Sequence, residues 1–268
     1  MQNSEQHGHT FSDSQDVEDI ALTSVLKPSW YIEQMKGWTK GSYILLVIGL
    51  VIIIGTTFLS PITPISLVTM FAAVLGFTCT ISITNTKPLN GVFGLVSALI
   101  YIVVAFTAKN YSDMLLQAVY IVLLDIPVLM MPGWAKNVGS RVRQIKDTPH
   151  AGRTWALFAL FFIVVLGALY GFEASFTDSP RPFIDALSAA IGVTGALLTT
   201  LRYSDTYYFW LAQGIMSVVL WGITALQGGA NWVLFITYLL YLSNDFIALF
   251  DKGVAWFHKE TMENDMLE

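Results

Sequence analysis

The chain has 268 residues, of which 54% are hydrophobic and only 12% are charged, and its mean hydropathy is +0.60. Soluble domains carry about 25% charged residues, so this composition excludes an ordinary soluble protein and indicates a membrane protein. The net charge of -5 mostly describes the ends, because 11 of the 19 acidic residues precede residue 41 or follow residue 250. The chain lacks the basic face typical of nucleic-acid binding, so we expect no nucleic-acid partner.

The first 41 residues are predicted to form a cytoplasmic polar tail and an interfacial segment. The opening residues, "MQNSEQHGHTFSDSQDVEDI", are polar and acidic, unlike an export signal. The next segment, "KPSWYIEQMKGWTKGSY", mixes Trp30, Tyr31 and Trp38 with lysines. Two interpretations stay open for it: a segment that lies on the membrane surface, or an ordinary aromatic belt before a membrane span.

Eight apolar stretches follow, each near the length of about 20 residues that crosses the hydrocarbon core. In chain order they cover residues 42–60, 64–83, 89–108, 113–132, 155–171, 183–201, 207–225 and 231–250. The first two are separated by "SPITP", whose prolines disfavour a continuous helix. The sequence therefore predicts an all-α polytopic membrane protein.

The distribution of lysine and arginine predicts the orientation of these spans. With eight spans both termini share one side, and the segments on that side hold 12 of the 14 basic residues. The opposite side holds only Lys109 and Arg181. Short basic loops stay in the cytoplasm, so we expect both termini inside a plasma membrane.

An internal repeat appears between the third and seventh spans. "GLVSALIY" begins at Gly94 and "GIMSVVLW" at Gly214, and the same offset of 120 residues relates Asp125 to Asp245. Two parallel three-helix repeats with a linker helix between them (3+1+3), preceded by one extra N-terminal helix, would explain both matches. The predicted division is 1–41 tail and interfacial segment, 42–60 extra span, 64–134 first repeat, 135–182 basic cytoplasmic loop and linker span, 183–256 second repeat, and 257–268 acidic cytoplasmic tail.

Polar side chains inside the hydrocarbon region are the candidate site residues, because they are costly there unless they face a cavity or a partner. The candidates are Asn90, Tyr101, Gln117, Tyr120, Asp125, Trp210, Gln213, Trp221, Tyr238, Tyr241, Asn244 and Asp245. Other interpretations remain for some of them: tryptophans near span ends are often interface anchors, and Gln117 could bond across helices. Cys79, the only cysteine, is expected to be small apolar filler.

Two segments carry a resemblance to a known family. "YSDMLLQAVYIVLLD" (111–125) and "RYSDTYYFWLAQGIMSVVLW" (202–221) resemble PnuC-type vitamin transporters, in which a Gln, a Tyr three residues later and a deeper polar residue recur. The resemblance covers about residues 64–256. It implies a 3+1+3 helix arrangement in a homotrimer that carries nicotinamide riboside or a related nucleoside-like vitamin by facilitated diffusion, with trapping by a separate cytoplasmic kinase. The repeated Gly and Ser positions predict alternating access, in which one triplet of helices moves against the other. No cofactor or metal is implied.

The candidate residues suit such a substrate. Aromatic rings stack on a flat base, amides and carboxylates bond a ribose, and a cationic base would gain from both ring faces and carboxylates. Other family substrates remain open, namely a deoxynucleoside, thiamine or riboflavin, with a sugar carrier further behind. A proton-coupled carrier using Asp125 or Asp245 is also open.

Two other classes of protein are disfavoured. All four histidines lie outside the predicted spans and no buried nucleophile motif accompanies them, so an intramembrane enzyme is not expected. A channel would need a pore loop or charged rings, for which the loops are too short.

Overall fold

The computed structural model describes residues 24–59, 61–130, 142–228 and 232–256. The expected tails at 1–23 and 257–268, and residues 135–141 of the basic loop, lie outside the described residues. Within the described part, eight helices are long and apolar enough to cross a membrane, which confirms the predicted all-α class and span count. They are α3 (Lys40–Phe58), α4 (Pro64–Thr84), α5 (Leu89–Thr107), a fourth span built from three pieces, α10 (Ala151–Phe176), α11 (Pro182–Thr200), α12 (Thr206–Leu226) and α13 (Trp232–Phe250).

Local sequence explains where the first two spans begin. The Thr39 hydroxyl caps α3 by accepting a hydrogen bond from the Ser42 amide at 3.2 Å. At the start of α4, Thr63 and Ser66 form a reciprocal capping box, and Pro64 takes the first helical position, where a missing N–H costs nothing. The predicted break at the prolines is therefore confirmed.

The fourth span is interrupted near its middle. It consists of α6 (Tyr111–Tyr120), a π-helical turn η1 (Ile121–Asp125) and α7 (Ile126–Met130). Pro127 has no N–H to donate to the carbonyl of Leu123 four residues earlier. The Thr200 hydroxyl of α11 donates to that carbonyl instead, at 2.8 Å. Asp125 ends the wide turn, and such turns are frequent at functional sites.

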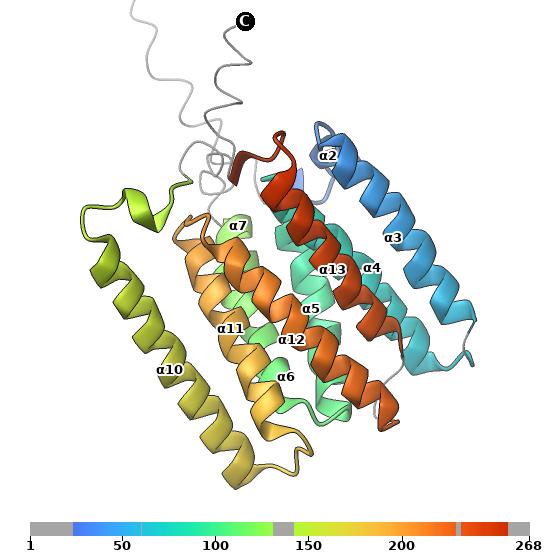
Figure 1. The fold of residues 1–268 in the computed structure, drawn as a ribbon. Coiled ribbons are helices and arrows are strands. Elements are labelled where there is room, and N and C mark those ends of the chain that lie inside the picture. Colours follow the sequence, from blue (N-terminus) through green and yellow to red (C-terminus); the bar gives the residue numbers. More distant parts are fainter. Residues whose placement is uncertain (1–23, 60, 131–141, 229–231, 257–268) are drawn as a thin grey trace, which may run out of the picture.

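Six helices form a closed ring, in the order α4, α5, α6, α11, α12 and α13, with α13 returning to α4 (Figure 1). The other two spans pack outside this ring. Helix α3 packs against α4 and α13, whereas α10 packs against α11 and, more lightly, α6. Among the residues of α10 only Phe158 and Glu173 are fully buried, so this helix is the most exposed of the eight spans.

The two ends of the bundle can be named by residues. The loops after α5 and α10 lie at what we call the Arg181 end (Figure 1). The loops after α4 and α11, the short helix α2 (Pro28–Gln34), the 3-10 turn η2 (Ile145–Asp147) and the segment after α13 lie at the opposite, Trp256 end. At the Trp256 end Tyr31 stacks on Phe93 with ring centroids 5.9 Å apart, so the aromatic segment before α3 packs against the bundle.

Candidate functional site

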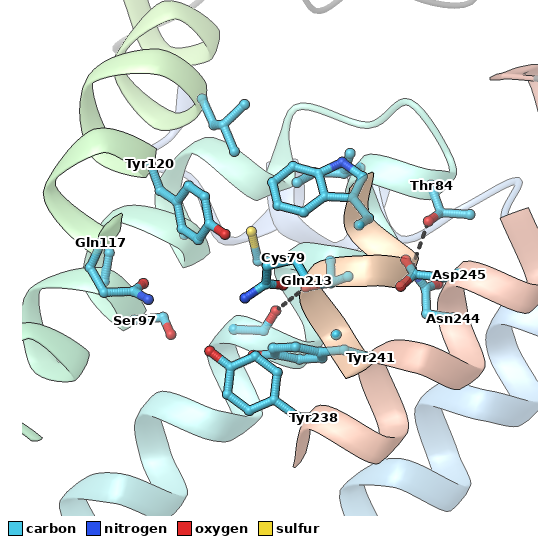
Figure 2. Close-up of a pocket in the computed structure, with 18 of the residues that line it drawn as sticks. Cys79, Thr84, Ser97, Gln117, Tyr120, Gln213, Tyr238, Tyr241, Asn244 and Asp245 are labelled. Carbon is cyan, nitrogen blue, oxygen red and sulfur yellow. Dashed lines mark hydrogen bonds between the residues drawn. The ribbon is translucent and has the colours of Figure 1, made fainter. Parts of the chain in front are cut away.

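A cavity lies inside the six-helix ring. It is lined by residues of α4, α5, the α6–η1 span, α12 and α13, and α11 closes the ring without lining it. Its volume of about 110 Å³ has room for several water molecules, since one needs roughly 10–15 Å³. Figure 2 shows the side chains of Gln117, Tyr120 and Tyr241 directed toward this space.

Two carboxyl groups are the acidic side chains of the cavity. Asp125 reaches it from η1 and Asp245 from α13, and both are buried, with 2% and 4% of their surfaces exposed. The described residues that line the cavity include no lysine, arginine or histidine. The site therefore favours positively charged over negatively charged ligands.

Two polar atoms at the cavity have no partner within the described protein. They are Oδ2 of Asp125 and Oδ1 of Asn244, both buried. A buried polar atom without a hydrogen bond costs about 1–3 kcal/mol, so each such atom in a folded protein needs an explanation. A ligand or water in the cavity supplies one.

Glycines make room for the carboxyl groups. A Cβ added at Gly94 on α5 would lie 2.1 Å from Oδ1 of Asp125. On α12, a Cβ at Gly214 would lie 2.6 Å from Leu242 and 3.7 Å from Oδ2 of Asp245. Each of these two glycines thus lies beside one of the acidic residues, at positions that the 120-residue offset relates.

Aromatic rings form much of the remaining wall. Tyr120 of α6 and Trp210 of α12 meet edge to face, with ring centroids 5.6 Å apart. Tyr238 and Tyr241 of α13 lie 5.2 Å apart in the same manner. These rings come from different helices of the ring and offer flat surfaces on which a planar group can stack.

The cavity is closed toward the Trp256 end by a hydrogen-bonded group. The Thr84 hydroxyl lies 3.1 Å from the Tyr207 hydroxyl and accepts from the Asn244 amide at 2.8 Å (Figure 2). Trp256 packs on Tyr207 and donates to the carbonyl of Ile83 at 3.0 Å. We call Thr84, Tyr207, Asn244 and Trp256 the Trp256-end closure.

A second closure lies toward the Arg181 end. The Tyr101 hydroxyl donates to the Tyr238 hydroxyl at 2.9 Å, and the Tyr101 ring meets Trp221 edge to face. The Trp221 indole donates to Oδ2 of Asp113 at 3.1 Å. Packed, hydrogen-bonded side chains thus lie between the cavity and each end of the bundle.

The structure places most of the candidate residues in this cavity. Those that line it are Tyr101, Gln117, Tyr120, Asp125, Trp210, Gln213, Tyr238, Tyr241, Asn244 and Asp245. Asn90 and Trp221 do not line it. Asn90 lies one helical turn before Gly94, and Trp221 lies two turns beyond Gly214, where it packs in the closure at the Arg181 end.

The sequence analysis missed several residues of the site. Cys79, expected to be filler, lines the cavity, as do Thr84 and Tyr207 at its Trp256 end. Small and hydroxyl side chains in apolar helices give little signal, because their usual roles are helix packing and bonds to their own backbone. Tyr207 was visible only as one of the aromatic residues at the start of α12.

Eight apolar helices, six of which surround a cavity with two carboxyl groups and aromatic walls, are the architecture of a polytopic membrane transport protein. The family model described as "Nicotinamide mononucleotide transporter" matches residues 66–257. The chain therefore belongs to this family, which is one of transporters rather than enzymes, and it is a multi-pass protein of the plasma membrane.

Individual relatives agree with this assignment. The chain is 25% identical over 220 residues to the nicotinamide riboside transporter PnuC of Neisseria mucosa, covering 80% of this chain and 81% of that protein. It is 24% identical over 166 residues to the protein of the same name from Haemophilus influenzae, covering 62% and 71% of the two chains. A crystal structure of the vitamin B3 transporter PnuC matches with a TM-score of 0.68 at 20% identity, covering 88% of this chain and 99% of that one. The last comparison shows the shared fold.

Proposed function

We propose that this protein carries nicotinamide riboside across the plasma membrane. Nicotinamide riboside joins a flat, positively charged pyridinium ring to a ribose. The observation that carries the proposal is a cavity with two buried carboxyl groups, aromatic walls and no basic residue among its described lining. Carboxylates and ring faces attract the cationic ring, by about 1–2 kcal/mol for a desolvated ring contact, and Gln117, Gln213 and Asn244 suit the ribose hydroxyl groups.

The same cavity argues against the phosphorylated form of this substrate. Nicotinamide mononucleotide carries a phosphate, which proteins bind with arginine, lysine or helix N-terminal amides. Asp125 and Asp245 would repel it instead. The riboside is therefore the better match, although the family description refers to the mononucleotide.

Other substrates of the family rank by the same argument. Thiamine also has a cationic ring, so it is the second candidate. Deoxynucleosides and riboflavin are uncharged and gain nothing from two carboxyl groups. A proton-coupled carrier that uses Asp125 or Asp245 is the alternative mechanism.

We propose alternating access as the transport mechanism. Opening of the Trp256-end closure and of the Tyr101–Trp221 contact in turn would expose the cavity to one side and then the other. Transport would be facilitated diffusion, with trapping by a separate cytoplasmic kinase, in a homotrimer whose two termini lie in the cytoplasm. The basic residues at the Trp256 end support that orientation, because Lys36, Lys87 and Arg202 all lie there.

Calorimetric titration of the purified protein tests the substrate. The panel is nicotinamide riboside, nicotinamide mononucleotide, thiamine, riboflavin and deoxyadenosine. We expect saturable binding of nicotinamide riboside, no binding of the mononucleotide, and weaker riboside binding in Gln117→Ala. Tight binding of the mononucleotide, or of deoxyadenosine alone, would contradict the proposal.

A further inference from the structure

A group of three buried carboxyl side chains lies outside the cavity, near the Arg181 end. Glu173 of α10, Asp185 of α11 and Asp113 of α6 are each at most 1% exposed. None of the three lines the cavity. Glu173 is also one of only two buried residues on α10, so it fixes the far end of that helix to the bundle.

Two of these carboxyl groups meet at the same backbone amide. The Ser112 N–H lies 2.7 Å from Oε1 of Glu173 and 3.0 Å from Oδ2 of Asp185. The Asp113 N–H donates to the other oxygen of Asp185 at 2.9 Å. The Glu173 and Asp185 carboxyl groups are themselves within hydrogen-bonding reach of each other.

The described residues place no cation in contact with this pair. The only ion pairs they form are Lys36–Glu33 and Lys109–Asp178, both exposed at the surface. Arg181 is near enough for its charge to act on both carboxyl groups, and its Nε is buried without a partner. Its hydrogen bonds nevertheless go to Asn110, the Ala108 carbonyl and Gln227, which are neutral. The remaining titratable neighbours are Asp113 and Tyr111 on α6, which supply no positive charge.

An unpartnered atom points to what is missing. Oε2 of Glu173 is buried and has no hydrogen-bond partner in the described protein. Two ionised carboxylates side by side in such a site would repel each other strongly, whereas one shared proton removes a charge and supplies a donor. A metal ion is the other usual solution, but the described part contains no group of three or more His, Cys, Asp or Glu arranged to hold one.

We propose that Glu173 and Asp185 share one proton, and that this pair is a proton-binding site that holds α10 and α11 against the start of α6. The pair connects to the cavity through Asp113, whose carboxylate accepts from the Trp221 indole, and Trp221 packs against Tyr101, a cavity residue. Loss of the proton separates α6 from α10 and α11 and loosens the closure at the Arg181 end. Because the pair lies outside the cavity, its proton controls opening and does not travel with the substrate.

Infrared spectroscopy of the full-length protein in lipid tests this site without any substrate, so the result does not depend on the proposed function. A shared proton gives the carbonyl band of a neutral carboxylic acid at neutral pH. Glu173→Gln and Asp185→Asn should each remove this band. In each variant the new amide donates a hydrogen bond to the remaining carboxylate, so no proton needs to be shared. Asp178→Asn, an exposed change of the same kind at the same end, should remove none.

The wild-type protein gives a second readout if either variant fails to fold. Glu173 is the only glutamate in the eight spans, so ¹³C-labelled glutamate separates its acid band from the bands of the buried aspartates. Raising the pH should shift a span glutamate signal when the shared proton leaves. Absence of that shift up to the pH of unfolding overturns the proposal. Persistence of the same acid band in both folded variants also overturns the proposal. Disappearance of that band when sodium is added at constant pH overturns it as well.

Discussion

Oδ1 of Asp125 occupies the space that a side chain at position 94 would need, since a Cβ added to Gly94 would lie 2.1 Å from it. The contact joins α5 to the π-helical turn of the fourth span. It fixes the carboxyl group at the cavity and leaves no room for a residue larger than glycine at position 94 of α5.

Gly94→Ala should therefore displace Asp125 and impair binding. Overpacking of this kind costs about 1–3 kcal/mol of folding free energy. Gly167→Ala on α10 is the matched control, because nothing lies within 4 Å of its added Cβ, and it should be neutral or slightly stabilising. Thermal unfolding and riboside titration of both variants check this, and equal behaviour of the two would contradict the packing argument.

Asp125→Asn should distinguish charge from shape at the site. We expect at least a tenfold loss of affinity for nicotinamide riboside, about 1.4 kcal/mol. The reduced riboside has nearly the same shape and an uncharged ring, so its affinity should hardly change. Asp178→Asn is the control, since that exposed carboxylate bonds Lys109 and Tyr111 at the surface. A parallel loss for both ligands would assign Asp125 a purely structural role.

Tyr207→Phe should loosen the Trp256-end closure. The variant loses the hydroxyl contact with Thr84, a hydrogen bond worth roughly 1 kcal/mol. Cys79 is the only cysteine and lines the cavity, so its rate of reaction with a maleimide reports access. We expect faster labelling in Tyr207→Phe and slower labelling with riboside bound.

Tyr208→Phe is the control for that measurement, because Tyr208 is the next residue and is 56% exposed. It should label like the wild type. Cys79→Ser should not label at all. Unchanged labelling in Tyr207→Phe would show that the cavity opens elsewhere.

Trp221→Phe should affect folding more than binding. The indole is fully buried and bonds Asp113, so its loss leaves a buried carboxylate oxygen unpaired at a cost of about 1–3 kcal/mol. It does not line the cavity. A lowered melting temperature with riboside affinity nearly kept is the expected result, with the half-exposed Trp232→Phe as control. Loss of affinity without loss of stability would restore Trp221 as a direct contact.

The contacts of Asp178 also predict how the stability of the folded state depends on pH. The hydrogen bonds from Lys109 and Tyr111 lower the pKa of its carboxyl group. A carboxylate whose pKa is lower in the folded state stabilises that state above its unfolded pKa, and this stabilisation is lost as the pH falls through the folded value. The contribution of so exposed a pair is small, so the melting temperatures of the wild type and of Asp178→Asn should differ little at neutral pH and still less in acid. Thermal unfolding of both proteins below neutral pH checks this.

The helices could be predicted from the sequence because hydrophobic length and proline positions determine them locally. The break before Pro64 and the eight spans are confirmed. The helical periodicity of the polar candidates also indicated the side of the third, fourth, seventh and eighth spans that lines the cavity. It cannot locate a cavity along the helix axis, which explains why Trp221 shares a face with Gly214 yet lies beyond the cavity.

The buried carboxyl pair could not be found in this way. The predicted fifth span ended at residue 171, which left Glu173 in a loop, whereas α10 continues to Phe176. Asp185 lies in the first turn of α11, where acidic residues are usually solvated or interact with the helix dipole. Only the packing of three helices brings these groups together.

The positions of α3 and α10 on the outside of the ring are similar. Each packs against the helix that follows it in the chain, and α3 also packs against the eighth span while α10 packs lightly against the fourth. The eight spans thus fall into two consecutive groups of four, α3 to α7 and α10 to α13. An even number of spans returns the chain to the side on which it began, so both groups begin at the Trp256 end of the bundle.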